Sequence, residues 1–352
     1  MKVVIAIDSF KGSMTSMQAG YAAKAGVLRA HPEAEVVVRP LADGGEGTTD
    51  ALVEGLGGIM RTLRVTGPLG NPVMASYGIL PESKTAVMEM AAAAGITLER
   101  EQHPLKATTY GVGEMIMDAI SQGCRNFIIG IGGSATNDGG IGMLQALGYT
   151  FLDSDGKTVE GGAGSLEKIA SVDDSQVAET LKMCNIQVAC DVNNPLCGPN
   201  GATYVYGPQK GVTGALLETV EQGMKNFAVV SADYLGKDFS EVPGTGAAGG
   251  MGFALLAYLN GKLTAGIDLI LDAIKLEQEI QTADYVITGE GRLDFQTAMG
   301  KVPVGVAKMA KKYEKRVIAF SGSVTPDARA CNASGIDAFF PILRSVVTLE
   351  EA

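Results

Sequence analysis

Several residue types are scarce in this chain of 352 residues, and each shortage narrows the range of functions. Tryptophan is absent, aromatic residues make up 6%, and there are only two histidines, His31 and His103. Both lie beside a proline in polar segments, which predicts surface positions rather than catalytic ones. The five cysteines form an odd set without a Cys-x-x-Cys pair. This argues against a disulfide framework and against a zinc ribbon.

Positive charge and long apolar runs are also in short supply. Lys and Arg number 28 against 39 Asp and Glu, giving a net charge of −11, and nucleic acids and anionic membranes select basic surfaces. The first apolar run stops at Asp8, too short for a signal-peptide core of about 7 to 15 residues. The longest run, residues 253–259, falls far below the roughly 18 residues that a membrane span needs. We expect a cytoplasmic protein with neither nucleic acid nor membrane as partner.

Glycine, in contrast, is abundant, with 47 residues. Average usage is about 7%, so this chain has nearly twice as much as usual. Glycines scattered among aliphatic runs predict loops in which the backbone approaches a ligand or turns with positive φ. The length predicts roughly two domains of about 150 residues each.

Both ends of the chain alternate apolar strands with helices. Residues 2–7 and 35–39 are expected strands, and a capping box at Thr15 and Gln18 opens the helix between them. The C-terminal part repeats the pattern, with strands expected over residues 283–288, 316–320 and 336–341 and a helix over about 300–312. Strands without polar alternation are typical of a parallel sheet covered on both faces.

The middle of the chain has a different texture. Residues 59–90 hold three strand candidates separated by glycine- and proline-rich turns, which favours a hairpin or meander. A further strand is expected over residues 126–131, after an amphipathic helix. Another hairpin is expected from residues 149–152 around the turn at Asp155 and Gly156.

These textures predict an α/β protein of two domains. We assign residues 1–60 and 283–352 to a doubly wound parallel-sheet domain, and residues 61–282 to an inserted mixed α/β domain. Near the end of the chain, Thr348 and Glu351 have the spacing of a helix N-cap and its third residue. We therefore expect a further C-terminal helix that this sequence does not include.

Six segments concentrate glycine with acidic, amide or basic residues next to a predicted strand or helix. In chain order they are residues 8–13, 42–48, 130–140, 189–198, 244–252 and 288–301. Ligands of α/β proteins bind at such places.

The first two segments combine an anion site with a pair of acids. Lys11, flanked by Ser9 and Ser13, lies beside an expected helix N-terminus, where anions bind. Asp43 and Glu46 lie among three glycines, and this arrangement suits Mg²⁺ or a substrate hydroxyl. An ordinary loop with a solvated lysine and a capped helix start remain alternative interpretations.

The segment 130–140 imitates a dinucleotide fingerprint. It matches G-x-G-x-x-A after a strand, with Asp153 at the end of the following strand. Asp138 at the helix entry suits a pyrophosphate poorly, whereas a phosphate nest that works with Mg²⁺ tolerates this acid. A second G-x-G-x-x-G over residues 244–249 lacks a preceding strand. No Walker A motif is present, because Phe151 stands where its first glycine is needed.

The remaining two segments carry acids beside polar or basic partners. Asp191 ends an apolar strand and is followed by Asn193 and Asn194, an arrangement that orients a substrate hydroxyl or forms a simple turn. Glu290 and Asp294 flank Arg292, which offers a fork for a carboxylate, and Lys301 adds a cation for phosphate.

The six segments together resemble a known family. Asp-Ser-Phe-Lys-Gly-Ser, Ala-Asp-Gly-Gly-Glu-Gly, Gly-Ile-Gly-Gly-Ser-Ala-Thr-Asn-Asp-Gly-Gly, Cys-Asp-Val-x-Asn-Pro-Leu-x-Gly, Gly-Ala-Ala-Gly-Gly-Met-Gly and Thr-Gly-Glu-Gly-Arg-Leu-Asp occur in the order of bacterial glycerate kinases of the first class. The resemblance extends from Met1 to about Pro341. It implies ATP- and Mg²⁺-dependent phosphorylation of D-glycerate to 2-phosphoglycerate. It also implies a flavodoxin-like domain, an inserted α/β domain and an active site in the cleft between them.

Residue roles can then be expected. Phosphoryl transfer needs positioning and charge neutralisation more than a covalent nucleophile. We assign Asp191, Lys11 and Arg292 to catalysis; Ser9, Ser13, Asp43, Glu46, Asn193, Asn194 and Lys301 to substrate or phosphate; Gly132, Gly133, Ser134, Thr136 and Asn137 to the nucleotide; and Asp43, Glu290 and Asp294 to the metal. A nicotinamide-dependent dehydrogenase and a non-catalytic nucleotide-binding module remain alternatives. The residues alone leave open which hydroxyl reacts and whether the chain forms a homo-oligomer.

Overall fold

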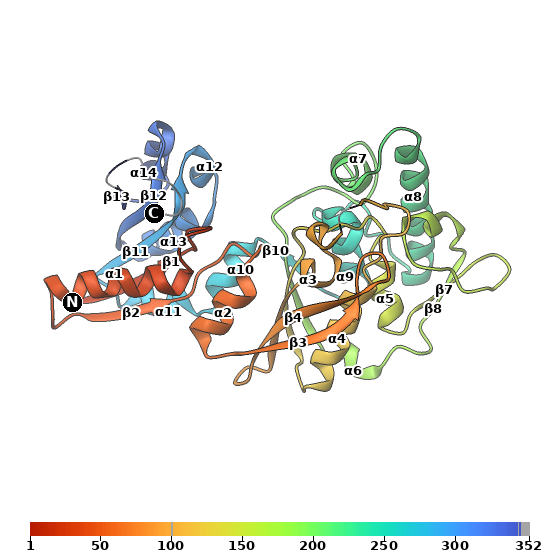
Figure 1. The fold of residues 1–352 in the computed structure, drawn as a ribbon, viewed down its shortest axis with the longest axis horizontal. Helices are drawn as coiled ribbons and strands as arrows, with labels where there is room; N and C mark the ends of the chain where they lie inside the picture. The colour runs from red at the N-terminus through yellow and green to blue at the C-terminus, as the bar shows by residue number, and fades with distance from the viewer. Residues whose placement is uncertain (100, 344, 346–352) are drawn as a thin grey trace. The chain divides into compact units, whose positions relative to one another are not determined.

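The computed structural model describes residues 1–99, 101–343 and 345, so Thr348 and Glu351 lie outside the described residues. The chain divides into two compact units. Unit 1 contains Met1–Gly58 and Gly266–Ala352, and unit 2 contains Ile59–Ala265. In Figure 1, unit 1 holds both the red start and the blue end of the chain, whereas unit 2 holds its middle.

Unit 1 is built on a five-stranded sheet in the order β13-β12-β11-β1-β2, and every neighbouring pair is parallel. The strands are β1 (Lys2–Ile7), β2 (Glu35–Arg39), β11 (Tyr285–Leu293), β12 (Arg316–Val324) and β13 (Ala338–Pro341). Counted along unit 1, this order is 2-1-3-4-5, which is the order of flavodoxin-like sheets. The α/β fold class expected from the sequence is confirmed.

Helices cover the sheet of unit 1 because its strands are apolar on both faces. They are α1 (Ser16–Ala30), α2 (Thr48–Leu56), α10 (Gly266–Ala273), α11 (Leu276–Gln281), α12 (Phe295–Ala298), α13 (Val302–Lys311) and α14 (Ala330–Ala333), with the short 3₁₀ turn η5 (Pro326–Arg329). Helix α1 begins at the capping box of Thr15 and Gln18. Val3 and Ile5 pack in the cluster that includes Ala19 of α1, while the alternating Val4 points to the other face and is also fully buried.

The boundary between the units differs from the sequence-based one at its second crossing. We expected the inserted domain to end at residue 282, but α10 and α11 belong to unit 1. Both helices pack against α13, and Glu279 of α11 forms ion pairs with Lys2 and Arg39 at the start of β1 and the end of β2. These contacts come from distant parts of the sequence, so local composition does not reveal them.

Unit 2 is built on a six-stranded mixed sheet in the order β10-β9-β6-β5-β4-β3. The strands are β3 (Ile59–Thr66), β4 (Pro72–Leu80), β5 (Thr85–Glu89), β6 (Asn126–Gly130), β9 (Asn185–Ala189) and β10 (Lys262–Thr264). Strands β3, β4 and β5 form the expected antiparallel meander, and β5, β6, β9 and β10 pair in parallel.

The helices of unit 2 enclose one large core. They are α3 (Ala91–Ala94), α4 (Tyr110–Ser121), α5 (Ile141–Ala146), α6 (Glu179–Lys182), α7 (Ala202–Tyr206), α8 (Ala215–Leu235) and α9 (Met251–Leu259), with 3₁₀ turns η1 (Ile96–Leu98), η2 (Ala163–Lys168), η3 (Pro208–Lys210) and η4 (Ala247–Gly250). The core includes an aromatic group in which Phe227 contacts Phe151 and Phe253 edge to face.

The hairpin expected around Asp155 and Gly156 is only partly correct. A turn closes there, and Leu152 forms an isolated antiparallel bridge with Thr158. The regular partner of β7 (Thr150–Leu152) is instead β8 (Ser171–Asp173), in a separate two-stranded sheet.

Among the residues that the structure describes, we find no helix with the length and apolar character that a membrane span requires.

Candidate functional site

The carboxyl ends of β1, β2 and β11 lie at the same edge of the sheet of unit 1. Asp8 and Asp43 follow β1 and β2, and Glu290 lies within the last four residues of β11. The register pairs Ile7 with Gly289, and the backbone N–H of Asp8 donates to the carbonyl of Gly289 at 2.9 Å. Asp8 therefore lies next to Glu290, and each is only 8% exposed. Asp43 follows β2, and its Oδ1 accepts the backbone N–H of Gly45 at 2.8 Å.

These acids repel one another, and this repulsion contributes to the raised pKa values of Asp8 and Glu290. Burial raises the pKa of Asp8 to about 7, and the charges of Asp43 and Glu290 add to the rise while the Ser9 N–H and Lys11 oppose it. Burial also raises the pKa of Glu290, with smaller contributions from Asp294 and Asp43. We call Asp8, Asp43 and Glu290 the acidic cluster. A cation, or a hydroxyl group that donates a hydrogen bond, would relieve this repulsion.

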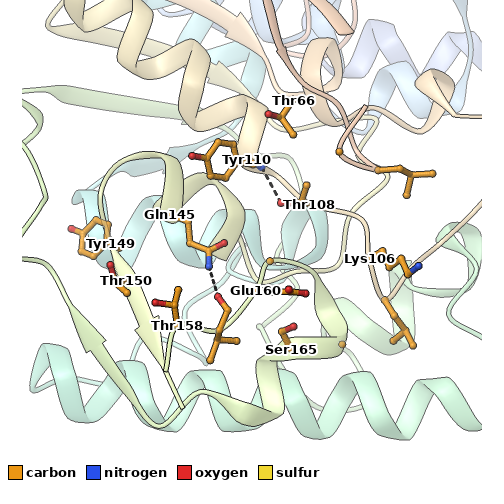
Figure 2. Close-up of a pocket in the computed structure, with 16 residues that line it drawn as sticks. Thr66, Lys106, Thr108, Tyr110, Gln145, Tyr149, Thr150, Thr158, Glu160 and Ser165 are labelled. Carbon is orange, nitrogen blue, oxygen red and sulfur yellow. Dashed lines mark hydrogen bonds between the residues drawn. The ribbon is translucent and has the colours of Figure 1, made fainter. Parts of the chain in front are cut away.

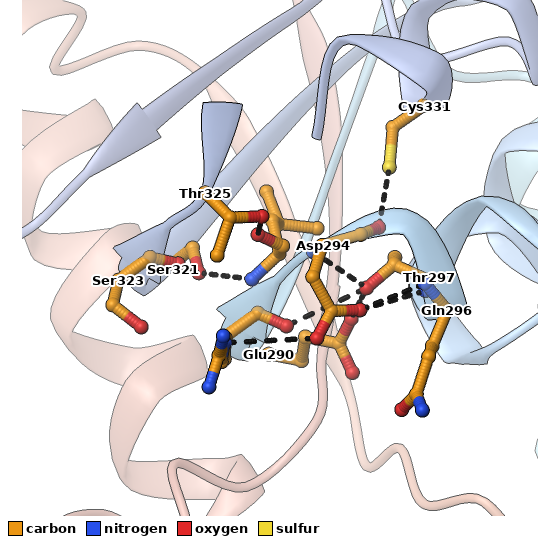
Figure 3. Close-up of polar contacts among 10 residues, drawn as sticks. Glu290, Asp294, Gln296, Thr297, Ser321, Ser323, Thr325 and Cys331 are labelled. Carbon is orange, nitrogen blue, oxygen red and sulfur yellow. Dashed lines mark hydrogen bonds and ion pairs between the residues drawn. The ribbon is translucent and has the colours of Figure 1, made fainter. Parts of the chain in front are cut away.

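Thr297 connects Glu290 to the start of α12 (Figure 3). Its hydroxyl donates to Oε1 of Glu290 and accepts the backbone N–H of Asp294 at 3.2 Å. Asp294 is the N-cap of α12, and its Oδ1 accepts the backbone N–H groups of Gln296 and Thr297. Its Oδ2 lies 3.6 Å from Nε of Arg292. The expected metal ligand Asp294 thus has a structural capping role in this structure.

The cations expected at the site lie at the surface of unit 1. Lys11 and Lys301 are exposed, and the side chain of Arg292 is 65% exposed. The hydroxyl-bearing Ser9 is half-buried, whereas Ser13 and Glu46 are exposed. In unit 1, Asp8 and Glu290 are thus nearly buried, whereas the cations of the motif segments are exposed.

In unit 2, the glycine-rich loop, residues 131–138, follows the carboxyl end of β6. Gly132 and Gly133 are exposed, and neither donates its backbone N–H to another described residue. Thr136 and Asn137 are fully buried instead, and Thr136 Oγ1 and Asn137 Oδ1 have no hydrogen-bond partner among the described residues. The loop thus exposes backbone donors and keeps two polar side chains inside.

Two charged residues support this loop: Asp138, which the sequence placed at the helix entry without indicating its partners, and Lys210, which sequence reasoning missed. Asp138 is fully buried and accepts hydrogen bonds from the backbone N–H groups of Thr109, Gly140 and Gly142 and from the Thr109 hydroxyl, tying α4 to α5. Lys210 is 2% exposed, and its Nζ donates hydrogen bonds to the Ser134 hydroxyl and the Thr136 carbonyl. The sequence Gln209-Lys210-Gly211 gave no signal, because it resembles any surface turn.

The dinucleotide fingerprint suggested by the sequence lacks its acidic member. Asp153 Oδ1 accepts the backbone N–H groups of Asp155 and Lys157, so this carboxylate closes its own turn. The second glycine motif, over residues 244–249, serves close packing: a Cβ on Gly249 would lie 2.1 Å from the carbonyl oxygen of Thr136. The expectation of a nicotinamide site therefore gains no support from these contacts.

The segment after β9 contains Asp191, Asn193 and Asn194, which were expected at the substrate, and one of them has a structural role. Asp191 and Asn193 are exposed. Asn194, in contrast, donates to the carbonyl of Asn200 at 2.7 Å and accepts the Tyr206 hydroxyl at 2.6 Å. Its own carbonyl accepts the backbone N–H groups of Gly244 and Gly246. Asn194 thus holds two loops together at the carboxyl end of β9.

The acidic cluster supplies only part of a coordination shell for Mg²⁺. Among residues 1–99, 101–343 and 345, no group of three or more His, Cys, Asp or Glu side chains forms a ready metal site. Mg²⁺ typically binds one or two carboxylates and completes its shell with phosphate oxygens and water. Two acids with mutual repulsion, Asp43 and Glu290, suit that pattern.

Unit 2 also contains an open cavity of about 880 Å³, between the start of α4 and the segment around η2 (Figure 2). Tyr110, Gln145, Tyr149 and Glu160 are among its lining residues. None of the sequence-predicted site residues lines this cavity.

Comparisons with known proteins show which family carries this arrangement. The sequence matches the glycerate kinase family over residues 3–352. The chain belongs to the glycerate kinase family. It is 48% identical to a glycerate kinase of Bacillus subtilis (strain 168) and 48% identical to a glycerate 2-kinase of Escherichia coli (strain K12). Each alignment spans 100% of this chain and 93% of the relative.

A solved structure from the same family has the same fold. The chain superimposes with a TM-score of 0.93 on a crystal structure from Salmonella typhimurium LT2 that is described as a candidate glycerate kinase 2. The two sequences are 45% identical, and the match covers 100% of this chain and 93% of the other.

Proposed function

We propose that this member of the glycerate kinase family transfers the terminal phosphoryl group of ATP to the 2-hydroxyl of D-glycerate, giving 2-phosphoglycerate and ADP. The observation that carries the proposal is the placement of the polar motif segments. In a chain that matches glycerate kinases from end to end, four of them follow the carboxyl ends of parallel strands, and a fifth, residues 288–301, begins within β11 and continues past its carboxyl end. Ligands of open α/β sheets bind at such ends.

Each unit contains groups of the kinds that the reaction needs. The glycine-rich loop offers exposed backbone at Gly132 and Gly133, where a phosphate can approach closely. In unit 1, Lys11, Arg292 and Lys301 supply cations for phosphate or for the glycerate carboxylate. Phosphoryl transfer depends mainly on such positioning and charge neutralisation.

A base is needed for the attacking hydroxyl. We assign this role to Asp191, which is exposed after β9, so its carboxylate can receive the proton of the glycerate hydroxyl. Asn193, exposed two residues later, can hold the same substrate without adding charge. Asp43 and Glu290 are the residues that would hold Mg²⁺. When bound, the ion neutralises charge on the phosphate oxygens.

The cytoplasm is the proposed location, because ATP is the co-substrate. All five cysteines are free thiols, as expected for a reducing compartment.

The decisive experiment is a coupled ADP-release assay with purified protein. We expect turnover that requires D-glycerate, ATP and Mg²⁺ together, with L-glycerate as a matched control. Phosphorus NMR of the product then identifies the phosphorylated hydroxyl. Absence of turnover with either enantiomer would overturn the proposal, and a 3-phosphorylated product would overturn its regiochemistry.

A further inference from the structure

Lys210 lies in an unusual place for a lysine. It ends η3, between α7 and α8, and its side chain is 2% exposed. Its Nζ donates to Oγ of Ser134 at 2.7 Å and to the carbonyl oxygen of Thr136 at 2.6 Å. Both acceptors belong to the glycine-rich loop, more than seventy residues earlier in the sequence.

Burying an ammonium group costs free energy unless the group is paired with an opposite charge and hydrogen-bonded. Loss of hydration lowers the pKa of Lys210 to about 7, and the charge of Asp138 only partly opposes this. An apolar side chain of similar length would pack in the same space without that penalty. Its two hydrogen bonds to the loop are therefore the feature that calls for an explanation.

Hydrogen bonds within unit 2 fix part of the loop, whereas Gly132 and Gly133 are exposed. The Ile96 N–H donates to the Gly133 carbonyl at 2.9 Å, and the Ala135 N–H donates to the Ala94 carbonyl at 2.8 Å. With the two bonds from Lys210, these contacts hold the backbone from Gly133 to Thr136. Gly132 and Gly133 still expose their N–H groups, which are donors suited to phosphate oxygens.

We propose that Lys210 is a positioning residue for nucleotide phosphate: its buried ammonium holds the glycine-rich loop with its backbone donors facing outward and adds a positive charge behind them. The inference rests on the proposed function, because it requires this loop to bind the nucleotide. Lys210 acts through Ser134 and Thr136 and is not itself a catalytic residue.

This role couples nucleotide binding to proton uptake. A bound polyphosphate favours the ammonium form, so the protein takes up a proton on binding whenever the free protein has a neutral Lys210. Lys210 borders a cavity of about 20 Å³, room for one water molecule, that Glu99, Glu101 and His103 also line. Asp138 faces the ammonium from the start of α5.

The test is calorimetric titration of the full chain with ADP. In Lys210→Met, ADP binding at pH 7 should weaken about ten- to a hundredfold, the range expected for loss of charge-assisted hydrogen bonds. Between pH 7.5 and 8.5, where the phosphates of ADP are fully ionised, the Kd of the unmodified protein should rise about tenfold. That of Lys210→Met should stay nearly constant. D-Glycerate binding should be unchanged.

Lys168→Met is the matched control, since Lys168 is an exposed lysine of the same unit and the substitution is the same. It should bind ADP with the affinity and the pH dependence of the unmodified protein. Should Lys210→Met fail to fold, Ser134→Ala takes its place. It removes one acceptor of Lys210, so ADP binding should weaken about threefold to tenfold.

The outcomes separate this inference from the proposed function. If the unmodified protein binds ADP and Lys210→Met binds it equally well with the same pH profile, the positioning role is wrong while the kinase proposal stands. If the unmodified protein does not bind ADP at all, both are overturned.

Discussion

The two units place charged groups differently at the carboxyl ends of their parallel strands. In unit 1 the nearly buried groups are acids, Asp8 and Glu290, and the cations Lys11 and Lys301 are exposed. In unit 2 the cation Lys210 and the acid Asp138 are both buried at the glycine-rich loop, and glycine backbone occupies the surface. The same strand-end position thus yields a place for positive charge in one unit and a place for negative charge in the other. Phosphoryl transfer needs both.

The largest expected effect on activity comes from replacing Asp191, the proposed base in unit 2. Asp191→Asn keeps the shape of the side chain and removes its basicity, so kcat should fall by about 10²- to 10⁴-fold with a modest change in KM. Steady-state kinetics measure this, with circular dichroism to check folding. Asp233→Asn, at an exposed site on α8, should leave kcat unchanged. A loss below about tenfold would reduce Asp191 to a substrate-positioning role and make Asp43 the next candidate.

Next in size is the effect on Mg²⁺. Glu290→Gln removes one charge from the acidic cluster while retaining the acceptor for Thr297. The Mg²⁺ concentration for half-maximal activity should rise about ten- to a hundredfold, because carboxylate ligands dominate Mg²⁺ affinity. A Mg²⁺ titration of initial rates gives the value, and Glu33→Gln, an exposed glutamate of unit 1, is the control. An unchanged Mg²⁺ requirement would show that unit 1 does not hold the ion through Glu290.

The acidic cluster should also destabilise unit 1 at high pH. The pKa of Asp8 is raised from 3.8 to about 7, so the unfolded chain binds fewer protons than the folded one between these values. Stability therefore falls as the pH rises through this window. Asp8→Asn should raise the free energy of unfolding by about 2 kcal/mol at pH 8, and the gain should vanish near pH 4.

Thermal unfolding at several pH values measures this effect. Asp272→Asn, an exposed aspartate on α10, is the control and should show no pH-dependent gain. Equal gains for Asp8→Asn at pH 8 and pH 4 would contradict the raised pKa of Asp8, which burial and the neighbouring acids produce.

The smallest effect is expected at Lys11. It is exposed and follows β1, so Lys11→Ala should raise the KM for glycerate or ATP about tenfold while the fold survives. Lys308→Ala, on the exposed side of α13, is the comparison. If KM for both substrates stays the same, Lys11 is a solvated surface residue and the anion site of unit 1 lies elsewhere.

Much of the architecture could be predicted because its signals are local. The capping box at Thr15 starts α1 as expected, and β2 has the expected bounds of residues 35–39. Strand β11 runs further than predicted, to Leu293 instead of residue 288, because its glycine-containing end pairs with β12: Glu290 lies opposite Ser321, and Arg292 opposite Ser323. Glycine-rich sequence predicts a loop unless a neighbouring strand supplies the pairing.

The site was less predictable than the fold. Acids and glycines after strands indicated where ligands bind, but the environments of individual side chains depend on distant contacts. Asp294 and Asn194 were expected to bind ligands, and the sequence did not indicate that Asp294 caps α12 or that Asn194 joins two loops. Lys210 gave no local signal at all, because its burial depends on residues 134–136.

The sheet of unit 1 also sets the order in which the protein can form. Strand β1 pairs with β2 on one side and with β11 on the other, and Val3 lies opposite Tyr285. At about 5 to 20 residues per second, a ribosome needs on the order of 10 to 50 s to synthesise the chain between these two partners. Throughout that time β1 has one open edge, which invites wrong pairing. Unit 2 is complete within the same interval, so on the ribosome the second unit along the chain can fold before the first.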